Sequence, residues 1–328
     1  MKILVTGATG FIGAILALKL ADSGHEVHAL CRSNPNDKLV SHPNIIIDRG
    51  DILNKEELKK AMHGCTQVFH LAAYARTGRG NPKPFYTTNI GGTINVMDCA
   101  IDSNIQKVIY TSTAGIFGPS DDLPTTEDSA RQSPFYNDYE CSKFIAEAKV
   151  RDYAANGLNV VILNPTRVYG PGLISQSNYF TQLILSYMKG KWHVIPGDGR
   201  VIANYVFIED VVDGHIKAME YEHTDKRYIL GGINASYNEL FETVNKYIEK
   251  KHRLFKVPLS LIKLYGATEL ISSKLLARDP VITPRWVKAL ETDGIRSSDK
   301  AVKELGYHIT PLDEGIKKTI NWLNNEII

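Results

Sequence analysis

A tyrosine and a lysine stand four residues apart in the segment Tyr139-Glu-Cys-Ser-Lys143. If this segment is helical, the spacing places both side chains on one face, one turn apart. An ammonium beside a phenol favours the phenolate, so the spacing predicts a lowered pKa for Tyr139. Such a phenol can give or take the proton that an alcohol–carbonyl redox reaction requires beside a hydride carrier. The same spacing is common on solvated helix faces, so the interpretation depends on the rest of the chain.

The N-terminus carries a glycine-rich turn between strand-like and helix-like segments. Residues 3–5 form a short apolar run typical of a buried parallel strand, and Gly7, Gly10 and Gly13 follow at three-residue intervals. Glycines at this spacing allow a tight turn, close approach of the backbone to a pyrophosphate, and packing of the helix on the strand. The helix N-terminus adds unpaired N–H groups and the positive end of its dipole. The pattern predicts a dinucleotide-binding turn.

The end of the second predicted strand, residues 26–31, bears on the choice of cofactor. An acidic residue there would accept hydrogen bonds from the adenosine ribose of NAD, whereas this chain has Arg32 followed by Ser33. A guanidinium and a hydroxyl suit a 2′-phosphate instead. An arginine at a strand end can also be an ordinary surface residue. NADP is therefore the favoured cofactor, with NAD as the alternative.

Further motifs lie between and after these two ends. They occupy residues 50–52, 68–73, 89–93, 111–118 and 164–172. Together with the nucleotide turn at residues 6–13 and the Tyr139/Lys143 pair, they resemble the extended short-chain dehydrogenases/reductases, the NAD-dependent epimerase/dehydratase family. The resemblance covers nearly all 328 residues.

The resemblance implies a role for each motif. Thr113 holds the place of the family's catalytic serine, five residues before Gly118, and its hydroxyl can still donate to a substrate oxygen. Ser112 is a poorer candidate, since strand alternation points it away from Thr113. The catalytic residues are then Thr113, Tyr139 and Lys143. The expected cofactor-binding residues are Gly7, Thr9, Gly10, Phe11, Ile12, Gly13, Arg32, Ser33, Asp51, Ile52, Leu71, Ala72, Ala73, Asn89, Thr111, Tyr139, Lys143, Pro165 and Val168.

These residues must be positioned by a regular alternation of strand-like and helix-like segments, which indicates a parallel sheet covered on both faces. Strands are expected near residues 2–6, 26–31, 45–48, 67–71, 107–112, 159–164 and 227–231. Helices are expected near residues 11–23, 54–62, 88–103 and 135–156. The predicted fold is α/β, a Rossmann-type doubly wound parallel sheet with a smaller, mainly helical C-terminal substrate lobe. The predicted domains are residues 1–170 with 203–232 for the dinucleotide, and 171–202 with 233–328 for the substrate.

The segment at residues 197–205 bears on the substrate. Sugar-nucleotide members usually carry an arginine shortly after the Gly-Asp-Gly turn, where it pairs with a substrate phosphate. Ala203 stands at that position here, and Arg200 is out of register. This segment resembles instead the dihydroflavonol-reductase and sterol-dehydrogenase-like branch. Arg76, Arg79 and Lys83 could supply another phosphate anchor, although a solvated basic loop is the ordinary interpretation.

The resulting functional prediction is an NAD(P)-dependent oxidoreductase. It transfers hydride between NADPH and the carbonyl or alcohol of a small, uncharged or hydrophobic substrate. The alternative is a sugar-nucleotide epimerase or dehydratase with tightly bound NAD(P), and a third interpretation is a non-catalytic NADP sensor.

The amino-acid composition bears on which classes of binding partner the protein has. Lysine and arginine total 38 against 36 aspartates and glutamates, so no strong field favours nucleic acid or a membrane surface. The four cysteines are widely spaced and no apolar run has membrane-spanning length, which predicts a cytoplasmic protein with reduced thiols. The ten histidines show no metal-ligand spacing, so no metal is expected. Family resemblance implies a homodimer formed through the helix that bears Tyr139. Asp210 is expected to cap a helix that begins at Val211.

Overall fold

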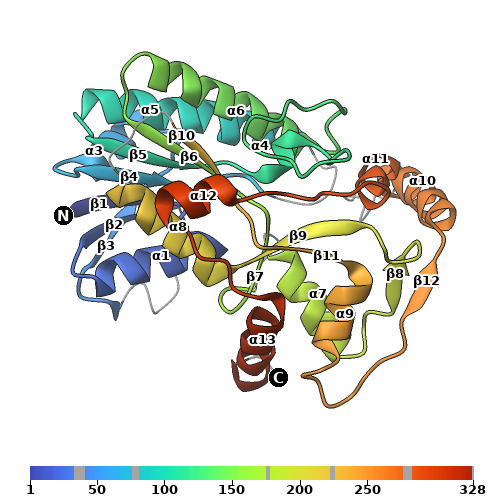
Figure 1. Cartoon of the computed structure of the whole chain (residues 1–328). Coiled ribbons are helices and arrows are strands. Elements are labelled where there is room, and N and C mark those ends of the chain that lie inside the picture. Colours follow the sequence, from blue (N-terminus) through green and yellow to red (C-terminus); the bar gives the residue numbers. More distant parts are fainter. Residues whose placement is uncertain (33–40, 76–80, 175–177, 222–225, 276–282, 327–328) are drawn as a thin grey trace.

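The computed structural model describes residues 1–32, 41–75, 81–174, 178–221, 226–275 and 283–326. A seven-stranded parallel sheet runs through the N-terminal part of these residues, in the order β10-β6-β5-β4-β1-β2-β3 (Figure 1). Its strands are β1 (Lys2–Thr6), β2 (Glu26–Cys31), β3 (Ile45–Arg49), β4 (Gln67–His70), β5 (Lys107–Thr111), β6 (Val160–Pro165) and β10 (Lys226–Leu230). These bounds confirm the seven predicted strands.

The strand order reverses at β1, and this creates the place for a ligand. β1 pairs with β2 on one side and with β4 on the other, and Ile3 lies between Val27 and Gln67. The connection after β1 leads to β2 and the connection after its neighbour β4 leads the opposite way to β5, so a crevice opens beyond the carboxyl ends of these two strands. The continuous apolar sequence of β1 is explained by burial on both faces, since Ile3, Leu4 and Val5 are fully buried.

Helices cover both faces of the sheet (Figure 1). One core joins α3 (Lys55–Met62), α5 (Thr93–Asp102) and α6 (Asp138–Ala155) to the sheet. On the opposite face, α1 (Phe11–Asp22) packs beside α8 (Ile208–Glu220). The four predicted helices are confirmed. The one expected at residues 88–103 begins earlier, with α4 (Lys83–Tyr86) and a π-helical turn (Thr87–Gly92) that leads into α5.

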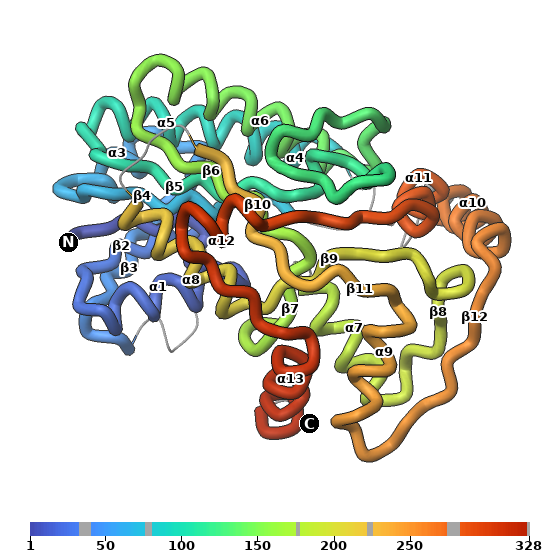
Figure 2. The backbone as a smooth tube through the Cα atoms, in the orientation of Figure 1, coloured from blue at the N-terminus to red at the C-terminus, as the bar shows by residue number. Residues whose placement is uncertain are grey.

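The remaining elements build a second lobe beside the sheet edge (Figure 2). A three-stranded sheet has the order β11-β9-β7, with β7 (Arg167–Tyr169), β9 (Ile202–Phe207) and β11 (Ile233–Ser236). A two-stranded sheet pairs β8 (Val194–Pro196) with β12 (Phe255–Val257). The helices of this region are α7 (Tyr179–Met188), α9 (Tyr237–Val244), α10 (Leu259–Leu275), α11 (Pro284–Val287) and α13 (Leu312–Glu326). Helix α12 (Asp299–Leu305) packs instead against β10 and α8 of the parallel-sheet part.

Asp210 has a different role from the predicted cap. Helix α8 begins at Ile208, so Asp210 lies inside its first turn, where it is buried. Its carboxylate accepts hydrogen bonds from the backbone N–H of Thr310 at 2.7 Å and from the Thr310 hydroxyl at 2.6 Å. The cap prediction was wrong because the helix starts earlier than the charge pattern suggested. Asp210 instead fastens the segment before α13 to α8.

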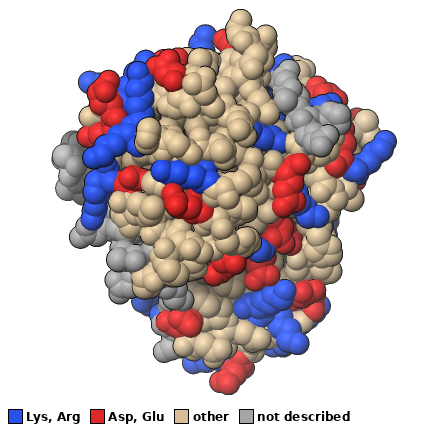
Figure 3. Space-filling model, turned by 90° about the vertical axis from the view of Figure 1, so that its left-hand side faces the viewer, with Lys and Arg blue, Asp and Glu red and all other residues tan. Residues whose placement is uncertain are grey.

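The surface shown in Figure 3 carries charges of both signs, as the near-equal numbers of basic and acidic residues predict. Lysine, arginine, aspartate and glutamate side chains are interspersed on the face shown in Figure 3. No helix within the described ranges combines the length and apolar character needed to cross a bilayer. Among those same residues, no group of three or more histidine, cysteine or acidic side chains is arranged to hold a metal ion.

Candidate active site at the carboxyl ends of the parallel strands

A cavity of about 450 Å³ opens at the carboxyl ends of the central strands. Its size is within the range of small-molecule and cofactor sites. Fourteen of the expected residues share its wall: Gly7, Thr9, Gly10, Phe11, Ile12, Gly13, Arg32, Ile52, Leu71, Ala72, Ala73, Thr111, Pro165 and Val168. The three expected catalytic residues, Thr113, Tyr139 and Lys143, also line it. The sequence motifs therefore converge on one site.

The glycine-rich turn packs so closely on neighbouring backbone that side chains are excluded at Gly7 and Gly13. Gly7 has a φ of +75°, and a Cβ there would lie 2.6 Å from the backbone nitrogen of Ala72. A Cβ at Gly13 would lie 2.2 Å from the carbonyl oxygen of Gly7. The N-cap of α1 is Gly10, which has no side chain to occupy the first-turn N–H groups, and no acidic residue lies in that turn. These donors and the helix dipole suit a pyrophosphate, so the residues present fit a dinucleotide.

Arg32 follows the carboxyl end of β2 and lines this cavity. Its side chain is 65 % exposed, and its Nη1 lies 3.7 Å from Oδ2 of Asp51. Asp51 itself is not on the cavity wall, although its neighbours Gly50 and Ile52 are. Ser33 lies outside the described residues, as do Arg76 and Arg79.

Helix α6 sets the positions of Tyr139 and Lys143. Its N-cap is Asn137, whose side-chain oxygen accepts a hydrogen bond from the backbone N–H of Glu140 at 2.8 Å. This cap starts the helix two residues before Tyr139, so both residues face the cavity one turn apart, as their spacing predicted. Lys143 is almost fully buried, and its Nζ donates to the carbonyl oxygen of Thr111 at 2.7 Å.

Burial, more than charge, controls the two titrating groups. Desolvation lowers the pKa of Lys143 to about 7, against an opposing effect of Glu147. Desolvation also raises the pKa of Tyr139 to about 12, and Glu140 adds to this rise. The predicted lowering of the phenol pKa is therefore not present, since burial disfavours both charged forms. Tyr139 is a neutral phenol here, and it has a proton to donate.

Thr113 presents a hydroxyl with a defined direction. It follows β5, and its Oγ1 accepts a hydrogen bond from the backbone N–H of Gly115 at 3.2 Å. Because that bond uses the oxygen as an acceptor, the hydroxyl proton remains available for a substrate oxygen. Ser112 also lines the cavity, and its buried Oγ has no partner among the described residues.

Asn89, one of the expected cofactor-binding residues, and His70 support the wall from behind. Asn89 is buried off the cavity, where its amide bonds both backbone groups of Tyr74 and donates to the hydroxyl of Ser142. His70 lies between the hydroxyls of Thr6 at 2.7 Å and Thr93 at 3.0 Å. Burial, with the nearby Lys143, lowers the pKa of His70 to about 3, so the ring is neutral. The contacts of His70 join the carboxyl ends of β1 and β4 to the start of α5, and those of Asn89 join the segment after β4 to α6.

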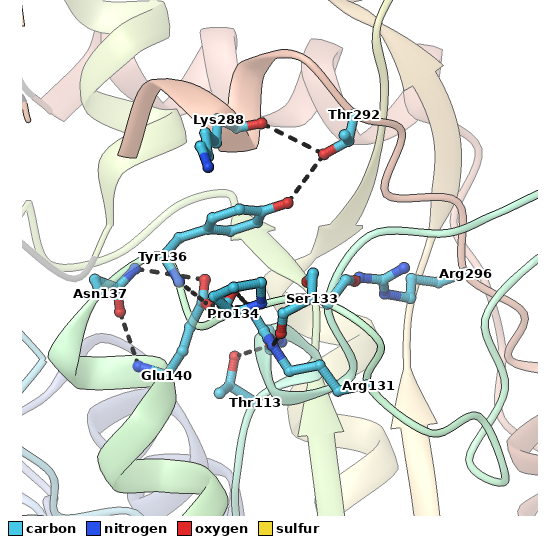
Figure 4. Close-up of polar contacts among 12 residues, drawn as sticks. Thr113, Arg131, Ser133, Pro134, Tyr136, Asn137, Glu140, Lys288, Thr292 and Arg296 are labelled. Carbon is cyan, nitrogen blue, oxygen red and sulfur yellow. Dashed lines mark hydrogen bonds and ion pairs between the residues drawn. The ribbon is translucent and has the colours of Figure 1, made fainter. Parts of the chain in front are cut away.

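A second cavity of about 220 Å³ adjoins the first. Thr113, Tyr139, Thr166 and Arg167 line both. Its outer wall includes Tyr136, whose hydroxyl lies 3.1 Å from that of Thr292 (Figure 4). The two cavities are therefore neighbours, and the candidate catalytic residues Thr113 and Tyr139 lie in the wall between them.

Arg131 forms a set of contacts, called here the arginine latch, that holds two wall residues of this second compartment, Gly115 and Glu140 (Figure 4). Arg131 donates to the carbonyl oxygens of Gly115, Ser133 and Pro134, at 2.6, 2.7 and 2.8 Å. It also forms an ion pair of 3.1 Å with Glu140. The latch ties the segment after β5 to the start of α6, and so fixes Thr113 relative to Tyr139.

Sequence reasoning missed several residues of the larger cavity, which are Leu30, Gly50, Ala75, Thr88, Ser112, Thr166, Arg167, Tyr179 and Phe180. Thr166 and Arg167 lie within the recognised motif at residues 164–172 and could have been found there. Tyr179 and Phe180 come from α7 in the other lobe, where no local motif signals contact with the site.

Replacing the buried lysine should change how stability depends on pH. Between about pH 7 and the unfolded value near 10.4, the unfolded chain binds a proton that folded Lys143 does not, so the free energy of unfolding rises with pH. A Lys143→Met variant lacks this dependence. The stability of the variant relative to the parent should be greatest near pH 7 and decline by up to about 1.4 kcal/mol per pH unit towards pH 10.

Urea unfolding at several pH values measures this difference. Lys149→Met removes a half-exposed lysine from the same helix and is the matched control. A stability difference for Lys143→Met that stays constant from pH 7 to pH 10 would contradict buried titration of Lys143.

Known proteins resemble this chain over almost its whole length. It is 29% identical to a protein of Synechocystis sp. named provisionally as a dihydroflavonol 4-reductase, with 98% of this chain and 94% of the relative covered. It is 27% identical to the mouse (Mus musculus) sterol-4-alpha-carboxylate 3-dehydrogenase, decarboxylating, with 97% and 90% covered.

Solved structures share the fold. The crystal structure of gox2253 matches with a TM-score of 0.83 and 28% identity, over 99% of this chain and 98% of the other. A UDP-glucose 4-epimerase of Thermotoga maritima, solved with UDP-glucose, matches with a TM-score of 0.82 and 24% identity over the full length of both. The model of the NAD dependent epimerase/dehydratase family matches residues 3–231. The chain therefore belongs to the NAD-dependent epimerase/dehydratase family and is an enzyme of the extended short-chain dehydrogenase/reductase type.

Proposed function

We propose that this protein is a reductase that uses NADPH to convert a ketone or aldehyde into an alcohol. The observation that carries the proposal is the shared wall of one cavity, where a neutral, partly buried phenol and an oriented hydroxyl lie beside the dinucleotide turn. The names of the reductase and dehydrogenase relatives support the same reaction class.

The chain's own residues supply proton transfer and orientation. When bound, the nicotinamide supplies the hydride. Thr113 donates a hydrogen bond to the carbonyl oxygen and polarises it. Tyr139 donates its proton to the same oxygen as negative charge develops there, which a neutral phenol in a dry site is suited to do. Lys143 holds the carbonyl of Thr111 and so keeps the end of β5 beside α6.

The raised pKa of Tyr139 keeps the phenol in the protonated form. A phenol with a pKa of about 12 gives up a proton only to a strongly basic partner, such as a developing alkoxide. Taking a proton from an alcohol would first require the phenolate, which burial disfavours. The protonated phenol is therefore the form that the reduction of a carbonyl uses.

A sugar-nucleotide epimerase or dehydratase is the second candidate, since epimerases are among the proteins with the same fold. Such an enzyme regenerates its cofactor in each cycle. A reductase instead consumes one NADPH for each carbonyl, which absorbance at the nicotinamide band measures. Turnover of a UDP-sugar without net loss of NADPH would favour the second candidate.

Tyr139→Phe should lower kcat by about two or more powers of ten, the scale of general acid catalysis. NADPH affinity should change little, because the ring is retained. Tyr153→Phe, which removes a phenol from the same helix where it bonds Asp98, is the matched control and should keep full turnover. Single-turnover kinetics and fluorescence titration measure the two quantities. Near-parental kcat in Tyr139→Phe would contradict the assignment.

We further propose that the cofactor is NADP, because Arg32 occupies the position at the end of β2 and lines the cavity. Arg32→Ala should weaken NADPH binding by about tenfold or more, the effect of losing hydrogen bonds to a charged group, while NADH binding changes little. Arg32→Lys keeps the charge but lacks the two parallel N–H donors of arginine, so its affinity for NADPH should lie between those of the parent and Arg32→Ala. Kd values for both cofactors measure this, and an unchanged ratio would reject the NADP preference.

We also propose that the protein forms a homodimer through α5 and α6. Ile101 on α5 and Phe144 on α6 are large apolar side chains that are 51% and 43% exposed, and pairing of these helices would cover them. Light scattering should report twice the chain mass of 36.5 kDa, and Phe144→Glu should reduce it to one chain. A parental protein that runs as one chain would refute this assembly.

A further inference from the structure

Arg167 is the first residue of β7 and follows the carboxyl end of β6 directly. Its guanidinium lies 5.5 Å from the ring centre of Phe180 and 5.9 Å from that of Tyr205. Contacts of this kind hold a cation in place without neutralising it. No carboxylate of the described residues forms an ion pair with Arg167, which lines both cavities beside Thr113 and Tyr139.

Arg296 lies on the wall of the second cavity and is only 9% exposed. Its guanidinium donates to the hydroxyl of Thr125 at 2.9 Å, to the carbonyl oxygen of Ile295 at 3.0 Å, and to that of Gly118. All three partners are neutral. Burial, together with the nearby Arg167, lowers the pKa of Arg296 to about 10, so the group remains a cation at neutral pH. A buried charge without an opposite charge is costly, and an anionic ligand would offset that cost.

The carboxylates of this compartment leave a positive balance. Glu140 is taken up by the ion pair with Arg131. Asp293 also lines the compartment, and one of its oxygens accepts from the backbone N–H of Ile202 at 2.7 Å. Asp293 can offset one of the two remaining guanidinium groups. One positive charge is therefore left in a partly enclosed space, where it acts strongly on a ligand.

The strand register shows how Arg167 compensates for the arginine missing at position 203. Arg167 pairs with Tyr205 across β7 and β9. Ala203 is two residues from Tyr205 on β9, so it lies on the same face of the small sheet. The cation that sugar-nucleotide members place on one strand is thus supplied here from its neighbour. The prediction of an uncharged substrate was based on position 203, its neighbours along the chain and the basic loop at residues 76–83, and it did not include Arg167.

We propose that the compartment between Arg167 and Arg296 binds an anionic oxygen acid, a carboxylate or a phosphate monoester, carried by the substrate. This inference rests on the proposed reductase function, because it assigns the carbonyl to Thr113 and Tyr139 and the acid group to the adjoining compartment. Two guanidinium groups recognise such an anion by charge and by paired hydrogen bonds.

Binding tests the compartment without relying on turnover. The protein is saturated with NADP, so that the cofactor's own phosphate sites are filled. Calorimetric titration then compares three ligands of one ring size: cyclohexanecarboxylate, cyclohexyl phosphate and the neutral cyclohexanecarboxamide. At least one of the two anions should bind about tenfold or more tightly than the amide, and the preferred one identifies the acid. Equal or absent binding of all three would overturn the proposal.

Variants of Arg167 locate the effect. Arg167→Gln should remove the preference for the anion over the amide, whereas Arg167→Lys should keep most of it. Arg200→Gln removes an arginine that is 85% exposed on the nearby turn, and it should leave the preference intact. Thermal unfolding confirms that each variant is folded. An anion preference that survives unchanged in folded Arg167→Gln would refute the role of Arg167.

Turnover separates this inference from the proposed function. NADPH oxidation is measured with 4-oxocyclohexanecarboxylate and with its amide. A lower KM for the acid than for the amide, lost in Arg167→Gln, would support both the reductase function and the acid compartment. Equal KM values for acid and amide would retain the reductase and reject the compartment. Selective, Arg167-dependent binding of an anion without oxidation of either ketone would retain the compartment and reject the reductase.

Discussion

The buried hydrogen bond from Lys143 to the carbonyl oxygen of Thr111 is the contact on which the candidate site depends. It joins α6 to the end of β5, and so brings Tyr139 from the helix and Thr113 from the strand to one wall. Removal of the ammonium from water makes this bond costly if the lysine is charged, and burial brings the pKa of Lys143 to about 7. The site therefore combines a positional constraint with a group that can change charge near neutral pH.

The same loss of water acts on each member of the site in a different way. It keeps Tyr139 protonated and His70 neutral, and these states suit a proton donor and a structural link respectively. It leaves Arg296 charged, because the unperturbed pKa of a guanidinium lies far above neutral pH. One low-dielectric pocket therefore holds a neutral acid beside a permanent cation. This arrangement suits a substrate with a carbonyl at one end and an anionic group at the other.

The two lobes contribute unequally to recognition. The parallel sheet supplies the dinucleotide turn, the phenol and the threonine, all from segments within the first 170 residues. The second lobe supplies Tyr179, Phe180 and Arg296, which surround the space beyond the reacting groups. The rings of Phe180 and Tyr205, which meet edge to face, also contact the guanidinium of Arg167. The candidate catalytic residues therefore come from the first 170 residues, and the second lobe completes the walls of the two cavities.

The sequence alone determined the parallel sheet, its covering helices and the grouping of Gly7, Thr113, Tyr139 and Lys143. The sheet and helices follow from short-range patterns, because apolar strands, glycine spacing and helical periodicity repeat within a few residues. The grouping of the four site residues follows from the family resemblance that the motifs carry. Only the tertiary structure decided the pKa values, the true role of Asp210 and the place of Arg167 beside position 203. Those properties depend on desolvation and on strand register between segments far apart in the chain, which no local pattern encodes.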